Sequence, residues 1–193
     1  MKSKKTVLIL VLVLAVLLGG AAALYARLGQ ETAPEQMAVQ EPQPEEGETP
    51  PARIAAPDFA VYDEAGNEVR LSDFFGKPIV LNFWASWCGP CKMEMPDFHE
   101  KYLELGEEIH FLMINATDGS RETVETAAAF IAGEGYTFPV FYDTTSDAAM
   151  TYGTYSLPTT FFIDAEGYAI VQARGAISAE NLQRGIDLIT AAE

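Results

Sequence analysis

The sequence predicts an α/β domain in which a mixed central β-sheet is flanked by helices, with an N-terminal β-hairpin and a central helical insertion. Between residues 54 and 193, short apolar or alternating segments typical of strands take turns with longer segments of helical periodicity. That alternation indicates a sheet with a parallel part. Near the end of the chain, two strand-like segments joined by a short turn precede a last helix, which makes the predicted sheet mixed.

The predicted domain begins with a hairpin and a buried strand. Residues 59–62 and 68–71 alternate in hydrophobicity around the turn-forming sequence DEAGN. Residues 79–84, IVLNFW, are almost continuously apolar, as expected of a strand that is covered on both faces. A helix from residue 88 to about residue 106 follows, and Pro96 is expected to kink it.

The second half of the domain supplies the helical insertion and the remaining strands. Ser120 is expected to cap an inserted helix that runs to Ala132, with Val124, Ala128 and Ile131 on one apolar face. Apolar patterns and turn residues predict the elements on either side of this helix. These elements are strands at residues 109–114, 138–142, 159–164 and 168–173 and helices at residues 146–152 and 179–191.

Composition divides the chain into three parts. Residues 1–29 contain an apolar run of 21 residues from Thr6 to Ala26. Residues 30–53 hold five prolines and six glutamates but almost no large apolar side chain, so we expect an extended, self-repelling linker. Residues 54–193 have the length and composition of one folded domain.

The apolar run predicts that the folded domain is exported. As a helix it would span about 31 Å, close to the bilayer hydrocarbon thickness of about 30 Å. The lysines that precede it predict a cytoplasmic N-terminus, a single pass through the cell membrane and an extracytoplasmic domain. The alternative is a signal peptide cleaved near the sequence AAA at residues 21–23, which would give a secreted protein.

The predicted domain is strongly acidic, with 22 Asp and Glu side chains against 7 Lys and Arg between residues 54 and 193. Such a surface repels phosphate backbones, so we expect no nucleic-acid partner. The charge keeps the domain soluble and away from anionic headgroups, and it can also favour basic partners.

Cys88 and Cys91 are the only cysteines of the chain, and they follow the predicted strand at residues 79–84. A disulfide between them would close so short a loop that it would add little stability. A zinc site would need further ligands, and the chain offers only His99 and His110, eleven residues apart and on different predicted elements. We therefore expect no metal site and interpret the pair as a reactive dithiol.

The spacing of the two cysteines favours redox chemistry. If Cys88 is the N-cap of the following helix, Gly89 and Pro90 occupy its first two positions. Because Pro90 has no N–H, the capping hydrogen bond should come from the Cys91 amide. A sulfur at the positive end of a helix is favoured as thiolate, which makes Cys88 the attacking sulfur. Cys91, one helical turn away, can approach closely enough to resolve a mixed disulfide.

The sequence resembles the thioredoxin superfamily. The string VLNFWASWCGPC after a buried strand, Pro96 eight residues beyond the first cysteine, and SLPTTFFID about 70 residues downstream carry the resemblance. The apolar N-terminus, the APDF opening, the helical insertion and CKMEMP are similar to the TlpA/ResA-like branch. The resemblance spans residues 57–189 and implies a thioredoxin-like fold and thiol-disulfide oxidoreductase activity.

The resemblance also implies roles for individual residues. Cys88 would attack a disulfide, and Cys91 would resolve the intermediate. Pro158 would be a cis proline beside the disulfide, in place of an ordinary proline at the start of a strand. Leu157 and Thr159, on either side of it, would bind an extended client peptide, with Leu157 offering backbone hydrogen bonds.

Glu94 is the candidate proton acceptor. Thioredoxins carry a buried Asp where Asn82 stands, and an amide cannot shuttle a proton. Glu94 follows Cys91 by three residues on the adjoining helix surface, and the TlpA/ResA-like pattern has a functional glutamate at this place. Spacing alone favours a solvated helix carboxylate, and it is the resemblance that favours the proton acceptor.

Two tryptophans flank the motif. Trp87, adjacent to Cys88, is expected to cover the rim of the site, whereas Trp84 is expected to pack in the core.

The leading functional hypothesis is an extracytoplasmic thiol-disulfide oxidoreductase that reduces disulfides in exported clients. By resemblance, the clients include apocytochrome c, the electrons come from a transmembrane thiol carrier of the CcdA/DsbD kind, and no cofactor is needed beyond the redox-active Cys88–Cys91 disulfide. The alternatives are a disulfide-forming oxidant, a thiol peroxidase and a non-catalytic peptide-binding module. The peroxidase pattern would need Pro and Thr where Leu81 and Ala85 stand.

Overall fold

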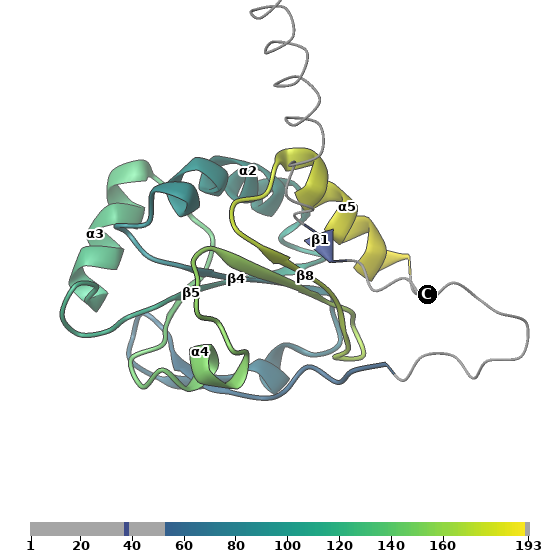
Figure 1. The fold of residues 1–193 in the computed structure, drawn as a ribbon, viewed down its shortest axis with the longest axis horizontal. Helices are drawn as coiled ribbons and strands as arrows, with labels where there is room; N and C mark the ends of the chain where they lie inside the picture. Colours follow the sequence, from purple (N-terminus) through teal and green to yellow (C-terminus); the bar gives the residue numbers. More distant parts are fainter. Residues whose placement is uncertain (1–36, 39–52, 192–193) are drawn as a thin grey trace, which may run out of the picture. The chain divides into compact units, whose positions relative to one another are not determined.

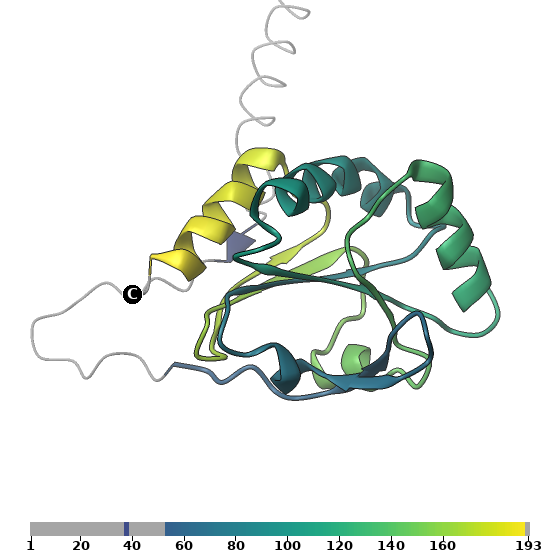
Figure 2. The same ribbon diagram turned by 180° about the vertical axis from the view of Figure 1, so that it is seen from behind.

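The computed structural model describes residues 37–38 and 53–191, and Figures 1 and 2 show it from opposite sides. The strands are β1 (Met37–Ala38), β2 (Ala60–Tyr62), β3 (Glu68–Arg70), β4 (Ile79–Trp84), β5 (His110–Asn115), β6 (Val140–Tyr142), β7 (Thr159–Ile163) and β8 (Ala169–Arg174). The helices are the 3₁₀ helix η1 (Leu71–Phe74), α2 (Gly89–Leu105), α3 (Val124–Glu134), α4 (Asp147–Thr151) and α5 (Ala179–Thr190).

The described strands form one eight-stranded sheet in the order β1-β8-β7-β4-β5-β6-β2-β3. β5 pairs in parallel with β4 and with β6, whereas β7 lies antiparallel to both β4 and β8. The antiparallel hairpin of β2 and β3 extends the sheet beyond β6. The structure therefore confirms the predicted α/β fold with a mixed sheet, an N-terminal hairpin and an inserted helix.

β4 lies inside the sheet and is buried on both faces, as its apolar run predicted. Helices α2, α3 and α5 cover one face, and η1 and α4 lie against the other (Figures 1 and 2). There is a hydrophobic core on each face of the sheet. Because successive strand residues point to opposite faces, alternate side chains of β4 pack in the two cores. Val80 and Trp84 belong to the first core, and Ile79, Leu81 and Phe83 to the second. The polar residue Asn82 interrupts the first set, on the side of α2.

The inserted helix was predicted with the wrong N-cap. The Asp118 side chain accepts hydrogen bonds from the backbone amides of Ser120 and the two residues after it, which holds Ser120 in a turn. The helix therefore begins later, where Thr123 is its N-cap and accepts a hydrogen bond from the Thr126 amide. Of the three residues predicted to share a face, Ile131 is buried and Val124 packs half-buried against the core, whereas Ala128 is exposed and Ala127 is buried instead.

β1 adds a short strand to the edge of the sheet beside β8, where Met37 pairs with Ala173. The sequence predicted no strand there, because the surrounding segment is rich in Pro and Glu. Pairing at a sheet edge uses backbone groups, so it needs no apolar side chain. The neighbouring residues 1–36 and 39–52 lie outside the described part of the chain, and the boundaries of the three predicted parts stay predictions.

The structure corrects the predicted single-pass localisation in the cell membrane. Within residues 37–38 and 53–191, no helix is both long and apolar enough to cross a bilayer. The apolar run at residues 6–26, on which the prediction of an anchor or signal peptide was based, lies outside these residues.

Gly185 shows how closely α5 packs on the sheet. A Cβ atom at this position would clash with the ring of Phe162 in β7. We expect Gly185→Ala to destabilise the domain by about 1–3 kcal/mol through overpacking, although Ala favours a helix over Gly by about 1 kcal/mol. Gly133 in α3 is the matched control, because no neighbouring atom lies within 4 Å of a Cβ built there. Gly133→Ala should stabilise by about 0.5–1 kcal/mol in denaturant unfolding, and equal effects of the two substitutions would contradict the packing argument.

Candidate active site

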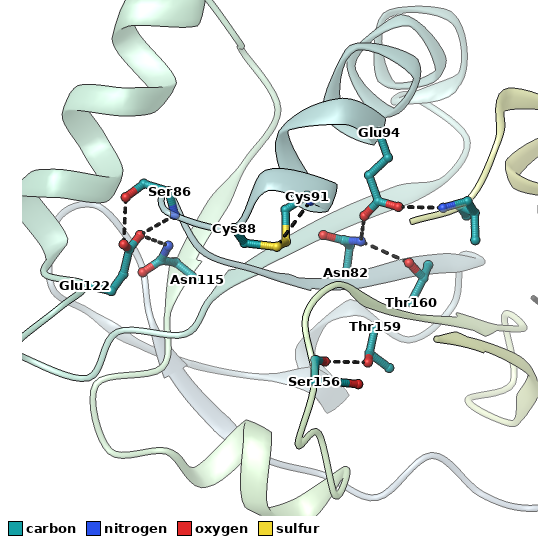
Figure 3. Close-up of a disulfide and its surroundings, with 11 residues drawn as sticks. Asn82, Ser86, Cys88, Cys91, Glu94, Asn115, Glu122, Ser156, Thr159 and Thr160 are labelled. Atoms are coloured by element: carbon teal, nitrogen blue, oxygen red, sulfur yellow. Dashed lines mark hydrogen bonds between the residues drawn. A yellow bond between two sulfur atoms is a disulfide. The ribbon is translucent and has the colours of Figure 1, made fainter. Parts of the chain in front are cut away.

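Cys88 and Cys91 form a disulfide at the beginning of α2, just after β4 (Figure 3). Cys88 is the N-cap of the helix, and Gly89 and Pro90 are its first two residues. The Cys91 amide donates a hydrogen bond to the Cys88 Sγ at 3.2 Å. This is the capping bond that the sequence predicted, because Pro90 has no N–H to donate.

The two sulfurs have different environments. Cys91 is completely buried, whereas Cys88 retains 4% of its surface and sits at the positive end of the α2 dipole. A helix N-terminus favours a thiolate over a thiol. In a reduced pair, these features favour Cys88 as the sulfur that attacks a client disulfide and Cys91 as the buried sulfur that resolves the mixed disulfide.

Glu94 lies on the side of α2 that faces the protein core, with only 3% of its surface exposed. Its Oε1 accepts a hydrogen bond from Asn82 Nδ2, and its Oε2 accepts one from the Ile177 amide, each at 2.9 Å. Burial raises the pKa of Glu94 to about 7, against the lowering effect of these two hydrogen bonds, and the charge of Asp97 adds to the rise. The side chain is therefore not a solvated helix carboxylate, and its pKa suits proton exchange near neutrality.

A second buried carboxylate, Glu122, lies on the other side of the disulfide from Glu94 (Figure 3). Its Oε1 accepts hydrogen bonds from the Ser86 amide at 2.8 Å and from Asn115 Nδ2 at 2.7 Å. Its Oε2 accepts one from Ser86 Oγ at 2.7 Å. Because Ser86 comes two residues before Cys88, Glu122 holds the segment that joins β4 to α2. Glu122 was not among the predicted site residues, because it falls within the predicted inserted helix and its partner Ser86 is 36 residues away.

Removing the Glu122 charge should loosen the segment before the disulfide. In Glu122→Gln, an NH₂ group replaces one acceptor oxygen and the bonds that remain are no longer charge-assisted, so we expect a loss of about 1–3 kcal/mol of stability. Denaturant unfolding measures this loss, and hydrogen exchange should show faster exchange of the Ser86 amide. Glu108→Gln, at an exposed glutamate, is the control and should change stability by about 0.5 kcal/mol or less. Unchanged protection of Ser86 would show that Glu122 does not hold this segment.

The two tryptophans lie where the sequence placed them. Trp84 is completely buried, whereas Trp87 is 41% exposed and directly precedes Cys88. The guanidinium of Arg121, from the segment before α3, lies over the Trp87 ring at 3.6 Å from its centroid. This stacking holds the indole in place beside the disulfide.

The segment before β7 contains the predicted proline. The Leu157–Pro158 peptide bond is cis, as the family resemblance implied. Leu157 is half-buried, whereas Thr159 is buried and its Oγ1 donates to the Ser156 carbonyl at 2.8 Å (Figure 3). The Thr159 backbone pairs with β4 on one side and β8 on the other. Of the two residues predicted to bind a client, Leu157 is therefore the one that reaches the surface, and the contact itself stays a prediction.

The chain is similar to known proteins over most of its described domain. Residues 53–172 match the AhpC/TSA family. The thiol-disulfide oxidoreductase ResA of Bacillus thuringiensis subsp. konkukian is 38% identical over 138 residues, which cover 70% of this chain and 76% of ResA. ResA of Geobacillus kaustophilus is 36% identical over 135 residues, which cover 69% of this chain and 75% of that protein.

Solved structures show a similar fold. The crystal structure of StoA from Bacillus subtilis matches with a TM-score of 0.59 and 25% identity, over 69% of this chain and 98% of StoA. These similarities confirm the predicted thioredoxin-like fold. The family match also includes both cysteines, Glu94 and the cis proline.

Proposed function

Because this chain is a thiol-disulfide oxidoreductase that belongs to the thioredoxin-like AhpC/TSA family, we propose that it reduces disulfides in exported protein clients. The observation that carries the proposal is the place of the disulfide, with Cys88 as the cap of α2 and Cys91 one turn behind it. A dithiol in this arrangement can both open a client disulfide and release the product.

In the first step, Cys88 attacks. The unpaired N–H groups and the dipole at the start of α2 stabilise its thiolate, and the Cys91 amide donates directly to its sulfur. The thiolate displaces one sulfur of the client disulfide. A bond forms between Cys88 and the client, and the other client sulfur leaves as a thiolate.

In the second step, Cys91 resolves the mixed disulfide. The Cys91 thiol gives its proton to the Glu94 carboxylate and attacks the Cys88 sulfur, so the client's second sulfur leaves as a thiolate. The client has then gained two electrons, and the protein carries the Cys88–Cys91 disulfide. The Glu94 pKa of about 7 supports this assignment, because a base with that pKa is partly ionised near neutral pH.

The disulfide must be reduced again before the next turnover. The pair itself carries both electrons, so we propose no further cofactor. A dithiol donor has the chemistry to restore the pair by two exchanges of the same kind. We propose a transmembrane thiol carrier of the CcdA/DsbD kind as this donor and the heme-binding cysteines of apocytochrome c as clients.

The surface beside the disulfide has room for a client. A pocket between Trp87 and Leu157 is also lined by Phe83 and by Tyr155, whose side chain is almost fully exposed. A client strand that pairs with the Leu157 backbone could place an apolar side chain in this pocket. Exposed aromatic residues at such a place are typical of a binding surface.

The test is the midpoint potential of the Cys88–Cys91 pair, measured by equilibrating the full chain with glutathione buffers. A reductant should have a potential below about −250 mV, whereas a disulfide-forming oxidant should lie closer to about −120 mV. The second value would overturn the proposed direction of electron flow. Rapid consumption of hydrogen peroxide by the reduced chain, with a small dithiol as electron donor and no added thioredoxin, would instead favour a peroxidase.

A further inference from the structure

Two buried side-chain atoms in the described part of this site have no hydrogen-bond partner, Trp84 Nε1 and the carbonyl oxygen of Asn82, and the second lies beside Glu94. Asn82 is completely buried in β4. Its Nδ2 donates to Glu94 Oε1 at 2.9 Å and to Thr160 Oγ1 at 3.0 Å. Its Oδ1 is buried and has no hydrogen-bond partner among the described residues. A buried carbonyl without a hydrogen-bond donor costs folding free energy, and a donor that it meets in another state of the protein would offset this cost.

The orientation of this amide is fixed by its neighbours. Both hydrogens of Nδ2 are used, and one of them meets the carboxyl group of Glu94. A flipped amide would turn both Nδ2 hydrogens away from their acceptors, and it would place the carbonyl oxygen against Glu94, where two acceptors repel each other whenever the carboxylate is ionised. Oδ1 is therefore held on the opposite side, and Figure 3 shows it turned toward the disulfide.

A disulfide has no hydrogen to donate, whereas a thiol has one. When a dithiol donor reduces the pair, the S–S bond breaks, the donor is oxidised to its disulfide, and two electrons and two protons pass to the protein sulfurs. The buried sulfur of Cys91 then carries an S–H group beside Asn82.

We infer that Asn82 is a positioning residue whose Oδ1 accepts a hydrogen bond from the Cys91 thiol in the reduced protein only. The inference rests on the proposed redox cycle. The bond stabilises Cys91 as a neutral thiol, since a carbonyl lone pair would repel a thiolate. It leaves the negative charge of the reduced pair on Cys88, the sulfur that attacks. The same amide donates to Glu94, so one side chain positions both Cys91 and its proposed proton acceptor without carrying the proton itself.

The chain is well suited to a direct test, because any S–H signal comes from its two cysteines. Infrared spectra of the reduced full chain, at a pH that protonates both thiols, should contain two S–H stretching bands. Cys88→Ala leaves the band of Cys91 and Cys91→Ala leaves that of Cys88. The Cys91 band should lie at the lower wavenumber, as expected of a hydrogen-bonded thiol.

Two variants then assign the acceptor. Asn82→Leu keeps the size of the side chain and removes the carbonyl, so the Cys91 band should move to the position of a free thiol. Thr160→Val is the matched control, because it removes an acceptor of the same amide but leaves Oδ1 in place. In that variant the band should stay low. A Cys91 band at the free-thiol position in the protein with native Asn82 would overturn the inference, whether or not the Asn82 variant folds.

The glutathione equilibrium gives a second readout. A bond made only by the dithiol stabilises the reduced state, so Asn82→Leu should shift the equilibrium toward the disulfide by about 3-fold to 10-fold. An unchanged equilibrium would contradict the inference. A Cys91 band at the lower wavenumber in the native protein, together with an oxidising midpoint potential, would overturn the proposed direction of electron flow. The inferred hydrogen bond would still stand.

Discussion

A Cys91→Ser chain should stop after the first step and accumulate as a covalent adduct with its client. The Cys88 thiolate can still open a disulfide, but no second thiol remains to release the product. Intramolecular attack has an effective concentration of about 10⁵ M or more in well-oriented systems. A millimolar solution thiol replaces it poorly, so we expect turnover to fall by at least about 1,000-fold. Intact mass spectrometry with a synthetic peptide that contains one disulfide would detect the adduct.

The partner variant tests the order of the two sulfurs. Cys88→Ser should form no adduct with the same peptide, because the remaining Cys91 is completely buried. Its turnover should fall to the background rate. An adduct that forms faster on Cys91 in this variant than on Cys88 in Cys91→Ser would reverse the assigned roles.

The central part of the fold was predictable because its signals are local. The apolar run at residues 79–84 gave β4 its correct limits, since a strand buried on both faces needs no polar alternation. The cap at Cys88 was also predictable, because Pro90 leaves only one suitable amide within the first turn. Such features depend on residues that are neighbours in sequence.

The rest of the site depends on contacts between distant segments. Glu94 is buried, and its carboxylate accepts a hydrogen bond from the Ile177 amide, 83 residues away. Glu122 reaches Ser86 across 36 residues, and neither contact leaves a periodic pattern in the sequence. The family resemblance pointed to Glu94 but gave no account of its environment. For Glu122, no pattern in the sequence provided a signal.

The inserted helix shows a local conflict that residue types alone do not settle. Ser120 and Thr123 are both good N-cap residues, and the sequence favoured the first. The Asp118 carboxylate binds the amides that a cap at Ser120 would have needed, including those of Arg121 and Glu122. The helix starts at the next available cap, and this start brings Glu122 to its place just before the helix.

Glu94→Gln should remove most of the pH dependence of stability near neutrality. In the folded protein the pKa of Glu94 is about 7, against a model-peptide value of 4.5. Because the folded pKa is the higher one, the folded state binds more protons than the unfolded state between these values. The contribution of Glu94 to stability is therefore complete below the unfolded pKa and is lost as the pH rises through about 7.

The size of the effect follows from the same two values. From about pH 5 to about pH 8, the native protein should lose about 2–3 kcal/mol of its free energy of unfolding through Glu94 alone. Denaturant unfolding of the oxidised chain at both pH values should show this loss, and Glu94→Gln should lack it. Glu100→Gln, at an exposed position of α2, should keep the native slope. An equal slope in the native and Glu94→Gln chains would mean that the Glu94 carboxyl already ionises near its ordinary pKa in the folded protein. The proton transfer assigned to it would then lose its physical basis, because a carboxylate with an ordinary pKa is a weak acceptor for a thiol proton.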